Sequence, residues 1–271
     1  MTPLVYAALA AVTYGASDFY GGVATRRADA TRVVLWSQVM GLGLVSIAAP
    51  IFGGGLAATD VGWGMAAGLA GALGLVSLYK GLSTGRAAVV APMSGVLSGV
   101  VPAMAGFVMG ERPSAVTLAG FVLAAAAVWL VSGGKLGEAS GFTLGVVAGV
   151  GFGSFFVFLS QIPESAGLWP LLPARAASVA VLVLVRGRKR SEPLAGSVWG
   201  LIGAVGLGDM AANVFILLAL QQGPLGEGAV VSSLYPAVTV LLSAILLREP
   251  VRRMQWMGLA MAIGAMALIA G

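Results

Sequence analysis

Two pairs of polar residues, each spaced four apart, lie inside long apolar stretches of the chain. Tyr14 and Asp18 lie in VTYGASDFYGG, and Asp209 and Asn213 lie in GLGDMAANVF. Because residues four apart point to one face of a helix, each pair places an acid beside a second polar group. An ionisable side chain at the centre of a bilayer costs about 3 kcal/mol on insertion scales, so it usually faces a cavity or a partner. The chemistry that fits is binding of an amine or a proton.

Each aspartate also has a structural interpretation. Asp18 could pair with Arg26 or Arg27 near the end of its helix, or cap a break at the following Gly-Gly pair. Asp209 could form a hydrogen bond between helices that serves only packing, as Asn commonly does in membrane bundles.

Arg175 is the only base predicted to lie within a span. It could bind a carboxylate or neutralise an aspartate, with snorkelling to the membrane surface as the alternative. Gln38 and Tyr235 are further candidate donors to a cavity. Tyr79 is a candidate of the same kind, although its place before Lys80 at the end of a span also suits the membrane interface.

Prolines interrupt two of the predicted spans. A proline frees a backbone carbonyl and bends a helix, which suits a gating helix or a cavity wall, although membrane helices also use proline for packing. Pro92 and Pro102 lie in the fourth span and Pro236 in the ninth, and Pro92 and Pro236 are the candidate gating residues.

The composition predicts an all-α integral membrane protein. Hydrophobic residues make up 59% of the chain and charged residues only 9%, where a soluble domain usually carries about 25% charged residues. With no His and no Cys, we expect no metal site, no cofactor and no enzyme. No Walker-type glycine loop is present, and no basic stretch is interleaved with aromatics, so neither ATP nor nucleic acid is an expected partner.

Ten transmembrane helices are predicted, with boundaries near 3–24, 33–53, 61–80, 87–109, 114–132, 141–161, 168–185, 195–219, 229–247 and 255–270. Of the 15 basic residues, all but Arg112 and Arg175 lie in or beside the odd-numbered loops. The positive-inside rule therefore places these loops in the cytoplasm and both termini on the extracytoplasmic side of a cell inner membrane.

The two halves of the chain align at an offset of 138 residues, the separation of Glu111 and Glu249. The segment GLSTGRAAVVAPMSG (81–95) falls on ALQQGPLGEGAVVSS (219–233), and Gly15 falls on Gly153. We expect two five-helix repeats, at 1–135 and 136–271. Because five is odd, the second repeat enters the membrane inverted, an arrangement typical of secondary transporters.

The repeat ends carry a family resemblance. The segment ALQQGPLGEGAVVSSLYPAVTVLLSAILLREP (219–250), followed by Gln255 and Gly258, resembles the EamA branch of the drug/metabolite transporter superfamily, with GER (110–112) and Gly120 as weaker equivalents. The chain departs from the family pattern in two places: Ser98 stands opposite Pro236, and the loop at 53–60 has no Lys or Arg.

The resemblance implies a secondary transporter that exports or exchanges a small molecule by alternating access, and it does not specify the substrate. We expect a metabolite such as an amino acid, with protons as a possible coupling ion. Efflux of lipophilic cations or many drugs is the alternative, and a channel is a third. An enzyme acting on lipid would need a cluster of catalytic groups, which the dispersed acids do not form.

Overall fold

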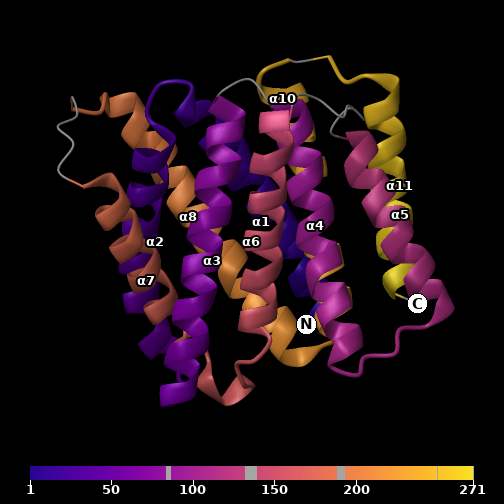
Figure 1. Ribbon diagram of the computed structural model, residues 1–271, viewed down its shortest axis with the longest axis horizontal. Coiled ribbons are helices and arrows are strands. Elements are labelled where there is room, and N and C mark those ends of the chain that lie inside the picture. Colours follow the sequence, from indigo (N-terminus) through magenta and orange to yellow (C-terminus); the bar gives the residue numbers. More distant parts are fainter. Residues whose placement is uncertain (84–86, 132–138, 188–192, 249, 271) are drawn as a thin grey trace.

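The computed structural model describes residues 1–83, 87–131, 139–187, 193–248 and 250–270. These residues form a bundle of helices that run roughly alongside one another (Figure 1). The helices are α1 (Pro3–Thr25), α2 (Ala30–Phe52), α3 (Ala58–Ser83), α4 (Ala87–Val108), α5 (Ala115–Val131), α6 (Ala139–Leu159), the 3-10 helix η1 (Glu164–Ala166), α7 (Leu171–Arg186), α8 (Gly196–Gln222), α9 (Leu225–Ser232), α10 (Tyr235–Leu246) and α11 (Arg253–Ala270).

The helices have the length and composition of membrane spans. Six helical segments are long and apolar enough to cross a bilayer, and two shorter apolar helices accompany them. In hydrocarbon every backbone N–H and C=O must find a partner within the protein, and a helix meets this need within one segment. Counting α9 and α10 as one, the described residues form the predicted ten long helices.

The ninth span is broken where the sequence analysis expected a continuous run from 229 to 247. The α9 helix ends at Ser232, and α10 begins at Tyr235. Pro236 lies in the first turn of α10, where a missing N–H costs no hydrogen bond, so the break precedes the proline. The fourth span differs, because α4 is one helix through the positions of Pro92 and Pro102.

Equivalent glycines make equivalent contacts in the two halves. A Cβ at Gly15 would lie 2.5 Å from the Tyr235 carbonyl oxygen, and one at Gly153 would lie 3.2 Å from the carbonyl oxygen of Leu97. Gly153 follows Gly15 by 138 residues, and Tyr235 follows Leu97 by the same number. Such equivalent contacts are expected when two inverted repeats are related by a pseudo-twofold axis.

A second pair of glycines repeats this relationship at the edge of the bundle. A Cβ at Gly120 would lie 3.3 Å from the Ala265 carbonyl oxygen, and one at Gly258 would lie 2.8 Å from that of Ala127. The same offset relates these contacts, which join α5 to α11. Small residues at these points let the helix backbones approach closely.

Glu111 ties the first half to the second. Its carboxylate accepts hydrogen bonds from the backbone N–H groups of Leu225 and Gly226, the latter at 3.0 Å. These are unsatisfied donors in the first turn of α9, where a negative charge also suits the helix dipole. Glu111 therefore has a structural role, whereas Glu249 lies outside the described residues.

Candidate functional site

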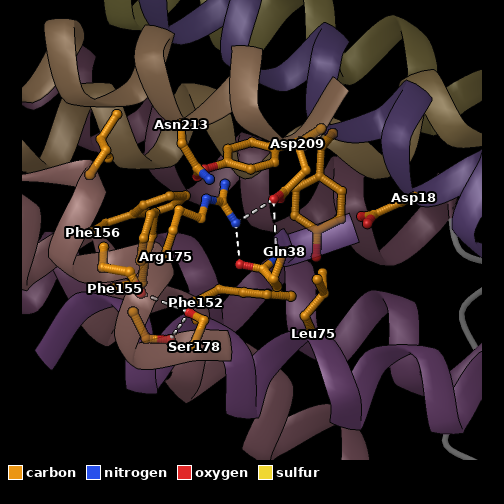
Figure 2. Close-up of a pocket in the computed structure, with 16 residues that line it drawn as sticks. Asp18, Gln38, Leu75, Phe152, Phe155, Phe156, Arg175, Ser178, Asp209 and Asn213 are labelled. Carbon is orange, nitrogen blue, oxygen red and sulfur yellow. Dashed lines mark hydrogen bonds and ion pairs between the residues drawn. The ribbon is translucent and has the colours of Figure 1, made fainter. Parts of the chain in front are cut away.

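Seven of the eight predicted substrate-binding residues line one central cavity, which Figure 2 shows. They come from α1, α2, α7, α8 and α10. The seven are Tyr14, Asp18, Gln38, Arg175, Asp209, Asn213 and Tyr235. Gln38 and Arg175 bring α2 and α7 into the lining, as their choice as candidates predicts.

An ion pair lies at the centre of this cavity. Arg175 Nη1 is 2.7 Å from Asp209 Oδ2, and the two side chains are 6% and 9% exposed. Gln38 joins the pair, because its Nε2 donates to Asp209 Oδ2 at 3.3 Å and its Oε1 accepts from Arg175 Nη1. Arg175 therefore neutralises an aspartate and does not snorkel to the surface.

Two tyrosines join helices that border the cavity. The Tyr14 hydroxyl donates to Asn213 Oδ1, which connects α1 to α8. The Tyr235 hydroxyl lies 3.0 Å from the Ser94 hydroxyl, which connects α10 to α4. The polar pairs recognised by their four-residue spacing thus meet across helices.

Two charged groups of the cavity keep unused hydrogen-bonding capacity. In the part of the chain that the structure describes, no group accepts a hydrogen bond from the buried Arg175 Nη2. Asp18 is 8% exposed, and no hydrogen bond or ion pair from a described residue reaches its carboxylate. The expected alternative of an Asp18 pair with Arg26 or Arg27 is thus not observed. Figure 2 shows Asp18 with its carboxylate turned toward the rest of the cavity.

The repeat places polar residues on one side of the cavity and apolar residues on the other. Tyr14 and Asp18 on α1 correspond at the repeat offset to Phe152 and Phe156 on α6. All four line the cavity. Equivalent positions of the two repeats therefore carry polar side chains on α1 and apolar side chains on α6.

The same relationship holds for a second pair of helices. Asp209 and Asn213 on α8 correspond to Gly71 and Leu75 on α3, and all four again line the cavity. The α1–α8 wall is polar, and the α3–α6 wall, completed by Phe155, is apolar. A molecule with a charged end and an apolar end matches this division.

The cavity is contracted in this structure. Its volume is about 50 Å³, which is room for a few waters and far below the roughly 300–1,000 Å³ of pockets that enclose drug-sized ligands. A second cavity of about 250 Å³ extends along α1 and α10 toward Arg26, Leu247 and Gln255. Asp18 and Tyr235 line both cavities, so they lie at the boundary between the two.

The remaining predicted residues lie elsewhere. Tyr79 is fully buried, and it does not line the central cavity. Its hydroxyl packs on Gly21, where an added Cβ would lie 2.1 Å away. Pro236 is buried and lines the second cavity, and the side chain of Pro92 is outside the described residues.

The sequence analysis missed the apolar wall. Phe152, Phe155 and Phe156 were indistinguishable from other apolar residues of a membrane span. The repeat itself held the missing signal, because two of these phenylalanines correspond to Tyr14 and Asp18. Ser178 was also missed, although it lines the cavity and donates to the Gly68 carbonyl oxygen at 2.7 Å.

A helical bundle of two inverted halves, with an ion pair and an amphipathic cavity between them, is an architecture typical of multi-pass membrane transporters. The chain belongs to the EamA-like transporter family, whose model matches residues 1–133 and again residues 139–271. It is therefore a membrane transporter of small molecules and not an enzyme, and the resemblance noted in the sequence is confirmed.

Solved structures support the fold. One crystal structure of a protein is similar over 98% of this chain and 95% of that chain, with a TM-score of 0.76 and 16% sequence identity. At this identity the similarity shows the fold alone. No curated protein matches the chain.

Proposed function

We propose that the chain exports or exchanges small zwitterionic metabolites, such as amino acids with apolar side chains, by alternating access. The observation that carries the proposal is a free donor and a free acceptor in one cavity. Arg175 Nη2 suits a substrate carboxylate, and the Asp18 carboxylate suits a substrate ammonium group. Unpaired buried charges are costly, so a ligand that satisfies both gains charge-assisted hydrogen bonds.

The apolar wall supports the same substrate class. Phe152, Phe155 and Phe156 can cover an aliphatic or aromatic side chain while the charged end faces α1 and α8. Protons are the proposed coupling ion. The repeats at 1–135 and 136–271 would rock against each other. Both repeats contribute residues to the lining of the cavity, which supports this choice of moving units.

Efflux of lipophilic cations is a second candidate. Arg175 and Asp209 cancel each other's charge, which leaves Asp18 as an uncompensated negative charge beside aromatic rings. An organic cation can bind such a site through the carboxylate and through cation–π contacts. This candidate leaves Arg175 Nη2 without a partner, which is the reason for placing it second.

Counterflow in liposomes tests the leading proposal. Purified protein would be reconstituted into vesicles loaded with unlabelled L-leucine, and uptake of radiolabelled L-leucine would be followed. A carrier accumulates the label transiently and a channel does not. Absence of counterflow for L-leucine and other apolar amino acids, with counterflow of a lipophilic cation such as tetraphenylphosphonium, would transfer the proposal to the second candidate.

A further inference from the structure

The two aspartates within the membrane have opposite environments. Asp209 has an ion pair with Arg175 at 2.7 Å and a hydrogen bond from Gln38 at 3.3 Å. Asp18 has neither kind of partner among the described residues, and it is 8% exposed. A buried carboxylate without a partner is costly when ionised, and a bound proton removes that cost.

The groups around Asp18 do not compensate its charge. Tyrosines are neutral at physiological pH, and the positive charge of Arg175 is already matched by Asp209. The titratable and charged groups nearby are Tyr14 on α1, Tyr79 on α3, Arg175 on α7, Asp209 on α8 and Tyr235 on α10, with Arg26 farther along α1.

Asp18 is also placed where protons and substrate can both reach it. It lines the central cavity together with Arg175, and it lines the second cavity that extends toward the odd-numbered loops. The second cavity, at about 250 Å³, can hold several waters, so a proton has a route between Asp18 and that side of the membrane. Asp209 lines only the central cavity.

We infer that Asp18 is the coupling-proton site, at which a proton and the ammonium group of the substrate compete for one carboxylate. Without substrate the carboxyl group is protonated and neutral. When the ammonium group binds, the carboxyl group ionises, pairs with it and releases one proton through the second cavity. The cycle is then an exchange of proton for substrate. This inference rests on the proposed zwitterionic substrate for the identity of the competing group.

Infrared difference spectroscopy on the purified full-length chain tests the inference. A protonated carboxyl group has a C=O stretching band that disappears on ionisation. The band of Asp18 should titrate with pH in the wild type, be lost in Asp18→Asn, and disappear when L-leucine binds. Asp60→Asn is the matched control, because Asp60 is 4% exposed, lines neither cavity and accepts a hydrogen bond from the Ala57 N–H at 3.0 Å.

Each result separates the inference from the proposed function. If L-leucine raises the melting temperature but leaves the Asp18 band unchanged, the inference is wrong and the substrate class stands. If L-leucine does not bind, the zwitterionic substrate fails, and the band alone decides whether Asp18 is a proton site. If no band that titrates with pH depends on Asp18, the inference is wrong in either case.

Transport assays add a measurement that would not change if Asp18 had only a structural role. In vesicles, Asp18→Asn should retain part of the L-leucine counterflow but lose accumulation driven by a pH gradient. Asp60→Asn should retain both. Accumulation driven by the gradient in Asp18→Asn would contradict the inference.

Discussion

Arg175 Nη1 lies 2.7 Å from Asp209 Oδ2 in the centre of the bundle, and this contact joins α7 to α8. Gln38 on α2 bonds to both partners. Because the two charges neutralise each other, neither is free to attract a charged substrate. One guanidinium nitrogen of Arg175 remains available to donate a hydrogen bond. The geometry of the pair therefore determines both the stability of the cavity and the charge that a ligand meets there.

Removing one partner of this pair should cost more than removing both. Arg175→Gln leaves Asp209 as a buried unpaired charge, and Asp209→Asn leaves Arg175 unpaired, each at a cost of about 3–5 kcal/mol. The double variant should lose less stability than either single variant, because neither charge is then left buried without a partner. Thermal unfolding of the four purified proteins in detergent measures this, and additive losses in melting temperature would show that the two residues do not interact.

A methyl group at Gly71 should narrow the cavity. The Cβ of Gly71→Ala would lie 3.2 Å from Phe155 Cδ2, so the ring must shift and the volume available to substrate decreases. We expect the apparent KM for the transported substrate to rise about tenfold, which corresponds to 1.4 kcal/mol. Gly62→Ala on the same helix is the control, because nothing lies within 4 Å of its added Cβ. Equal KM values for both variants would contradict the location of the site.

Loss of the Glu111 carboxylate should loosen the start of α9. Glu111→Ala removes the acceptor for the Leu225 and Gly226 N–H groups, which should cost about 1–2 kcal/mol. Glu164→Ala is a suitable comparison, because Glu164 is exposed and, among the described residues, its carboxylate accepts a single 3.5 Å bond, from Gln222. Thermal unfolding should show a clear decrease for the first variant alone, and equal stability would remove Glu111 from its capping role.

Residues related by the repeat should differ in accessibility. Thr239 on α10 lines the second cavity, whereas its repeat equivalent Val101 on α4 packs on Gly153. The chain has no cysteine, so Thr239→Cys and Val101→Cys each introduce a single thiol. A membrane-impermeant thiol reagent should modify Thr239→Cys faster in the resting protein, and a transported substrate should reduce that difference. Equal rates that substrate does not change would contradict alternation between the two halves.

The sequence predicted most of the helices because an apolar run bounded by charges is itself the physical requirement for a span. It also predicted the central polar residues, since a charge in hydrocarbon needs a partner or a cavity. Pro236 marked the ninth span as interrupted, but the sequence could not show that the helix ends at Ser232, because Pro92 and Pro102 lie in a helix that continues. The burial of Tyr79 could not be predicted, because it depends on packing between helices, including the close approach of its hydroxyl to Gly21 on α1.

The most direct test of the central claim is ligand binding by the purified wild-type protein, followed by thermal unfolding. The compounds to compare are L-leucine, 3-methylbutylamine, which lacks the carboxylate, and 4-methylpentanoate, which lacks the amine. L-leucine should raise the melting temperature more than either analogue, and Arg175→Gln or Asp18→Asn should remove this advantage. A larger increase with the amine than with L-leucine would contradict zwitterion recognition and favour cation efflux.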